Sequence, residues 1–116
     1  MKTVRLELDG LNAAASAFSA AWRTGRAEAE TRISFQSPEL LWKVLTAKRW
    51  ELLQALAGQG TLAIRELARR LGRDVKGVHG DVHALLDAGV IEQGSNGRGV
   101  CFPYDAIHVD FVLKAA

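Results

Sequence analysis

The most informative pattern of apolar and polar residues lies between Thr61 and Gln93. A first stripe recurs at the helical period, at Ile64, Leu67, Ala68 and Leu71. Gly72 follows it, where a left-handed glycine commonly ends a helix. Asp74 is placed to cap a second helix, whose predicted buried face is Val75, Val78, Val82, Leu85 and Leu86. Because so short a turn makes the two helices cross steeply, the pattern predicts a helix-turn-helix.

The residues on either side extend this unit. Apolar runs at 90–92 and 100–102 are separated by a loop with an Asn-Gly pair, which predicts a β-hairpin, or wing, with Arg98 at its tip. Upstream, Ser37 and Thr46 are expected to cap two further helices. We expect Trp42 and Trp50 to anchor the core. Cys101, which lies in a wing strand, is expected to be a small buried hydrophobe.

Strict alternation marks both ends of the chain. Residues 3–9, 32–36 and 106–114 are predicted strands, and an alanine-rich helix is expected from Leu11 to about Glu28. The fold class is therefore α+β, with a winged helix-turn-helix domain at 37–116 that ends in a C-terminal strand. A strand-helix-strand arm at 1–36 is expected to mediate dimerisation, or to form an extra layer on the monomer core. The first and last strands would be exposed edges in a monomer, paired with each other or with a partner chain.

Composition and charge bound the class of protein. A chain of 116 residues that is 48% hydrophobic buries one modest core. Its net charge is only +2, but residues 65–76 hold five basic and two acidic side chains. That local excess lies where a helix pair would meet phosphates. There is no membrane-length apolar run and no signal-peptide pattern, and there is one cysteine, so a cytoplasmic location is expected and a membrane partner is not.

The second helix of the pair carries the functional hypothesis, which is contact with double-stranded DNA. Lys76, His79, Gly80 and His83 are expected to read the major groove, and Gly77 and Gly80 to let the backbone approach it. The phosphate backbone would be held by Arg69, Arg70, Arg73 and Arg98. The competing interpretation is that this face is merely solvated.

Other chemistries have weaker support. His79 and His83 are four residues apart, a spacing that can chelate zinc, and Cys101 and His108 are candidates to join them in a metal-sensing repressor. No third ligand is evident from the spacing, so no metal site is predicted. We find no nucleophile–base pair, phosphate-binding loop or paired carboxylates, and therefore expect neither an enzyme nor a cofactor.

The segment from Ser37 to Ala116 resembles the MarR-like winged-helix predicted transcriptional regulators of bacteria and archaea. The resemblance is carried by SPELLWKVLTAKRWELLQAL, IRELARRLGRDVKGVHGDVHALLDAGVIE and FPYDAIHVDFVLKAA. It implies a homodimeric, sequence-specific DNA-binding regulator, typically a repressor. It also leaves open an antitoxin that binds a toxin protein and regulates its own operon. Two departures from the family pattern are Ala63, where a capping serine or threonine is usual, and the glycines at 77 and 80, where larger side chains are usual.

Overall fold

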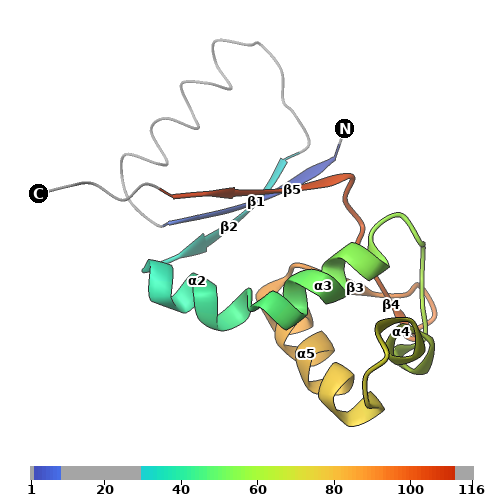
Figure 1. The fold of residues 1–116 in the computed structure, drawn as a ribbon. Coiled ribbons are helices and arrows are strands. Elements are labelled where there is room, and N and C mark those ends of the chain that lie inside the picture. The colour runs from blue at the N-terminus through green and yellow to red at the C-terminus, as the bar shows by residue number, and fades with distance from the viewer. Residues whose placement is uncertain (1, 9–29, 112–116) are drawn as a thin grey trace, which may run out of the picture.

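The computed structural model describes residues 2–8 and 30–111, which form an α+β fold (Figure 1). The strands are β1 (Thr3–Leu8), β2 (Glu30–Phe35), β3 (Glu92–Gln93), β4 (Val100–Cys101) and β5 (Ala106–Asp110). The helices in the described ranges are α2 (Pro38–Val44), α3 (Ala47–Leu56), α4 (Ile64–Leu71) and α5 (Val75–Ala88). The alanine-rich helix expected at 11–28 lies outside the described residues.

Three strands from the two ends of the chain form one parallel sheet in the order β2-β1-β5. Val4 lies opposite Thr31 and Ile107, and Leu6 lies opposite Ile33 and Val109. The predicted pairing of the last strand with the N-terminal region is therefore confirmed within the chain. The expectation that the first strand would be an exposed edge was wrong, because β1 is central and its Val4 and Leu6 are fully buried. Helices α2 and α3 lie on the side of the sheet that carries these apolar residues (Figure 1).

Ion pairs connect the strands on the other face of the sheet. Arg5 of β1 donates to Glu30 of β2 at 2.7 Å and to Asp110 of β5 at 2.8 Å. Arg32 of β2 donates to Glu7 of β1 at 2.9 Å. These pairs connect charges between adjacent strands, as expected for cross-strand neighbours on one face.

The caps predicted from the sequence are confirmed. The hydroxyls of Ser37 and Thr46 each accept a backbone N–H at the start of α2 and α3, and Asp74 accepts the Lys76 N–H at 2.8 Å. Gly72 and Gly89 end α4 and α5 in the left-handed conformation. Ala63 is the N-cap residue of α4 and provides no side-chain hydrogen bond, also as predicted.

Several expectations about burial were wrong. Trp42 and Trp50 are 53% and 39% exposed, so the core is built instead from aliphatic residues such as Leu41, Leu52 and Leu56. Val75 is 44% exposed because it begins α5, one turn before the helix reaches the core at Val78. Cys101 is half-buried rather than buried.

The β3–β4 hairpin is held against the segment that precedes α4. Leu62 and Val100 exchange two backbone hydrogen bonds of 2.9 Å. Gly99 has a φ of +69°, and a Cβ added there would lie 2.7 Å from the Leu62 carbonyl oxygen. This close approach requires glycine. None of the helices in the described ranges combines the length and apolar character that a membrane span requires.

The uncapped start of α4 gives a first prediction. Ala63→Ser should raise the free energy of unfolding by about 0.5–2 kcal/mol, because Ala63 is exposed and a serine hydroxyl there can accept a first-turn N–H of α4. Chemical denaturation measures this as a higher midpoint with an unchanged denaturant slope.

The matched control is Ala57→Ser. Ala57 is also exposed and adjoins a helix, but it is the C-cap residue of α3, where the first-turn N–H groups are absent. It should change stability by less than about 0.5 kcal/mol. Equal effects of the two serines would contradict the capping explanation.

Candidate functional site

Helix α5 is positioned by a carboxylate on its inner side. Asp81 accepts from Arg49 Nε at 3.0 Å and from Arg73 Nη2 at 2.7 Å. Arg49 extends from α3 and also donates through Nη1 to the carbonyl oxygens of Lys43 and Val44, at the end of α2. Arg73 belongs to the turn between α4 and α5. One carboxylate thus connects α5 to α3 and to the turn, and through Arg49 to α2.

Charge and burial both act on this carboxylate. Partial burial raises the pKa of Asp81, but the bonds and positive charges of Arg73 and Arg49 outweigh this, and the pKa lies below its usual value. The Asp81 side chain is 16% exposed, so these bonds are only partly accessible to competing water. Arg73, which was predicted to contact phosphate, is therefore engaged by Asp81 and helps to hold the helices together.

The outer face of α5 is exposed at each predicted base-reading position, namely Lys76, His79, Gly80 and His83, and at Gly77, where the backbone was expected to approach the groove. Apart from its chain neighbours and the backbone of its own helix, no atom lies within 4 Å of where a Gly80 Cβ would stand, whereas a Gly77 Cβ would lie 3.4 Å from Arg73 Nη2. The Nε2 atoms of His79 and His83 are 3.1 Å apart. This face therefore offers one long cation, two imidazoles and accessible backbone.

Two of the other three arginines predicted to contact phosphate, Arg69 and Arg70, share one acid within α4. The Glu66 carboxylate accepts from Arg69 Nε at 2.9 Å and from Arg70 Nε at 3.0 Å. Arg69 donates a further hydrogen bond through Nη2, and the bonds from Arg69 and Arg70 together lower the pKa of Glu66 to about 2. The Arg69 side chain remains 72% exposed, while Arg70 also donates to Gln59. Two guanidinium groups against one carboxylate leave a net positive charge on the outer surface of α4.

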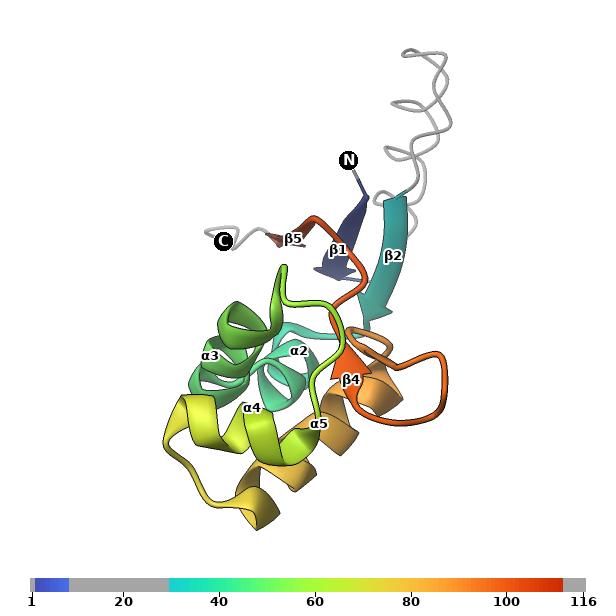
Figure 2. The same cartoon turned by 90° about the vertical axis from the view of Figure 1, so that its right-hand side faces the viewer.

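Arg98 lies in the hairpin loop and is exposed. Within residues 2–8 and 30–111, neither Arg98 nor Lys76 forms an ion pair. Both views place α4 and α5 at the end of the molecule farthest from the three-stranded sheet (Figures 1 and 2). The predicted DNA-contact residues of α4 and α5 are thus separated from the sheet, and Arg73, in the turn between the two helices, points inward to Asp81.

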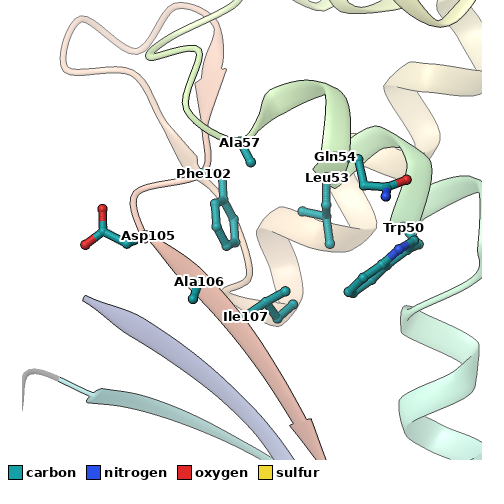
Figure 3. Close-up of a pocket in the computed structure, with 8 residues that line it drawn as sticks. All are labelled: Trp50, Leu53, Gln54, Ala57, Phe102, Asp105, Ala106 and Ile107. Carbon is teal, nitrogen blue, oxygen red and sulfur yellow. The ribbon is translucent and has the colours of Figure 1, made fainter. Parts of the chain in front are cut away.

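A separate small cavity of about 190 Å³ lies between α3 and β5 (Figure 3). It is lined mainly by apolar side chains, and its lining residues are Trp50, Leu53, Gln54, Ala57, Phe102, Asp105, Ala106 and Ile107. The Asp105 carboxylate points away from the apolar group and accepts the Lys2 N–H at 2.7 Å. The cavity is smaller than the roughly 300–1,000 Å³ of typical ligand pockets, so it is not the candidate site.

The four possible metal ligands predicted from the sequence do not form one group. Among the described residues, no cluster of three or more histidine, cysteine, aspartate or glutamate side chains is arranged to hold a metal ion. Only His79 and His83 come together, while Cys101 and His108 lie on β4 and β5.

Comparison with known proteins identifies a family for this arrangement. The family model HVO_A0114 matches residues 44–109, which is more than half of the chain and includes α3, α4, α5 and the hairpin. The chain belongs to the HVO_A0114 family. The match to HVO_A0114 includes Asp81 with both of its arginine partners, as well as the outer face of α5. No curated protein and no solved structure was found to match.

Sequence reasoning missed the role of Asp81. The signal was present, since Val78, Asp81, Val82 and Leu85 recur at the helical period and place an acid within an apolar stripe. A charge in such a position requires a partner. Arg49, which is 32 residues away, was not identifiable as that partner from spacing alone.

A second prediction follows from this cluster. Asp81→Asn should lower the free energy of unfolding at neutral pH by about 1–3 kcal/mol, because two partly buried guanidinium groups lose their counter-charge. Asp87→Asn is the matched control, because Asp87 is an exposed acid on the same helix.

The pH dependence has a defined sign. Because the folded-state pKa of Asp81 is lowered, its contribution is present above the ordinary value of 3.8 and is lost as the pH falls through the folded-state pKa. Denaturation from pH 7 to pH 2 should therefore show wild type and Asp81→Asn converging in acid. A constant difference across this range would contradict the assignment.

Proposed function

We propose that this protein is a winged helix-turn-helix regulator that binds double-stranded DNA as a homodimer and acts as a repressor. The observation that carries the proposal is the two-sided character of α5. Its inner side is fixed by Val78, Val82 and Asp81, while its outer side is exposed over nearly three turns. A rigidly held helix with an open polar face suits insertion into a major groove.

The order of the elements supports the winged-helix interpretation. The chain runs from α3 through the bridge at Leu62 to α4 and α5, and then into β3 and β4. The bridge at Leu62 brings the hairpin back against the start of the helix pair. In this arrangement α5 is the recognition helix and the loop with Arg98 is the wing. The resemblance to MarR-like regulators points to the same assignment.

The exposed cations divide into two roles under this proposal. Lys76, in the first turn of α5, is suited to a guanine edge or a nearby phosphate, and His79 and His83 extend the same face. Arg69 and Arg98 are suited to phosphates because both are exposed outside α5. Arg73 is better assigned to holding α5 than to contacting DNA, because Asp81 engages it.

Salt dependence tests the proposal first. The affinity for a mixed-sequence duplex, followed by fluorescence anisotropy, should fall steeply with salt, since each phosphate contact displaces about 0.9 counterion. For a dimer we expect the logarithm of the binding constant to fall with the logarithm of the salt concentration with a slope of roughly −4 or steeper. A flat response would rule out this mode of binding.

Three substitutions then separate base contacts from phosphate contacts. Against a duplex selected from a random pool, Lys76→Ala and His83→Ala should each reduce discrimination from random duplex by about 1–3 kcal/mol. Arg98→Ala should weaken both affinities alike. Lys43→Ala is the control, because Lys43 is an exposed lysine on α2, close to the sheet. If all four variants behave alike, α5 is not the recognition helix.

We assign the interface of the homodimer to the end of the molecule that carries the three-stranded sheet. Within the described residues β2 and β5 are the edge strands, and unpaired edges favour strand addition. Trp42 and Phe111 lie beside this sheet with their ring centroids 5.9 Å apart, and both are exposed. An exposed aromatic pair next to an open edge suits a second copy of the chain.

The dimer prediction has its own measurement. Trp42→Ala should weaken self-association at least about tenfold in sedimentation experiments, because an exposed tryptophan at an interface is a common hot spot. Val75→Ala, which truncates another exposed apolar side chain, on α5, should leave association unchanged. A full-length chain that is monomeric at micromolar concentration would contradict the homodimer.

A further inference from the structure

The two imidazoles on the outer face of α5 form a pair whose nitrogen atoms have about the spacing of a metal chelate. His79 and His83 stand one turn apart, their Nε2 atoms are 3.1 Å apart, and their ring centroids are 4.2 Å apart. Two nitrogens bound to one tetrahedral zinc ion, each at about 2.0–2.1 Å, stand about 3.3 Å apart. The pair is therefore within a few tenths of an ångström of the spacing that zinc requires.

Access to the pair is open. Both histidines are exposed, and the space above Gly80, which lies between them in sequence, holds no other atom within 4 Å of a Cβ position. Asp87 lies one turn beyond His83 and is also exposed, but among the described residues no carboxylate joins the two histidines in a group of three possible ligands. A hydrated ion can therefore approach without displacing a packed side chain.

We propose that His79 and His83 form a two-ligand site for a divalent transition-metal ion of the zinc type, with one ion per chain. Imidazole nitrogen suits zinc, nickel and copper, whereas magnesium and calcium prefer oxygen ligands. The helix presents both nitrogens on one face before the ion arrives, so the second bond forms at a high effective concentration. Water fills the remaining coordination positions.

The site goes beyond the proposed DNA contact and does not depend on it. Its test uses the full chain without DNA, so failure of either proposal leaves the other intact. The alternative explanation of the short distance is a hydrogen bond between two neutral imidazoles, which involves no metal.

Isothermal titration with zinc chloride at pH 7.5 provides the test. The wild-type chain should bind one zinc ion per chain, and His79→Gln or His83→Gln should each weaken binding on the order of 100-fold through loss of the chelate. His108→Gln is the matched control, since it removes the third histidine, an exposed residue on β5, and should bind as wild type does. Cys101→Ser should also bind as wild type, which excludes the thiol.

Unfolding experiments provide a second readout. An ion that binds the folded chain raises the denaturation midpoint. Zinc should do so for wild type and His108→Gln, while magnesium should not, and both α5 variants should lose the effect. Absence of saturable zinc binding would overturn the proposal. Binding that survives in both α5 variants, that disappears in His108→Gln or Cys101→Ser, or that saturates at one ion per two chains would also overturn it.

Discussion

The carboxylate of Asp81 is the interaction on which the arrangement of the helices depends. Hydrophobic contacts bring α3, α4 and α5 together, but apolar packing is non-directional and tolerates small rotations of a helix about its axis. Asp81 removes that freedom, because its two oxygens accept from Arg49 and Arg73 on different elements. Rotation of α5 would break at least one of these bonds and leave a partly buried charge without a partner. The buried stripe of Val78, Val82 and Leu85 determines which face of α5 points inward, and the ion pairs restrict the remaining rotation of the helix about its axis.

The tertiary contacts of α5 also support its helical conformation, because its sequence has little intrinsic preference for helix. Gly77 and Gly80 lie in its first two turns, and three valines accompany them, so its conformation depends on capping by Asp74 and on burial of Val78 and Val82. The glycines lie on the exposed side, where they remove bulk that would keep the backbone away from a partner. Under the proposed function, the two glycines lower the helix propensity of α5 but allow DNA to come closer to its backbone. The tertiary contacts on the inner side of α5 compensate for the lost helix stability.

Much of the local structure was predictable from the sequence. The caps at Ser37, Thr46 and Asp74 and the left-handed glycines at 72 and 89 depend on near neighbours, and each was identified. The predictions that were wrong concern tertiary contacts. Trp42 is large and apolar, but its burial depends on which elements cover α2. The central position of β1 depends on β2 and β5 both pairing with it, and alternation within β1 cannot reveal two partners. At the candidate site, exposure of the outer face was predictable, whereas the engagement of Arg73 by Asp81 was not.

Because of the helical period, substitutions in α5 that affect stability lie on a different face from substitutions that affect the proposed contacts. Val78, Asp81 and Val82 face inward and Lys76, His79 and His83 face outward, although the two sets are interleaved between positions 76 and 83. Replacing an outward residue removes no ion pair among the described residues and leaves the buried core unchanged. A loss of binding at those positions therefore reports on the ligand. Replacing Asp81 removes the bonds that hold the outer face in its orientation, without changing a residue on that face. If a variant loses both stability and binding, the residue holds α5 in its orientation. If it loses binding alone, the residue contacts the ligand.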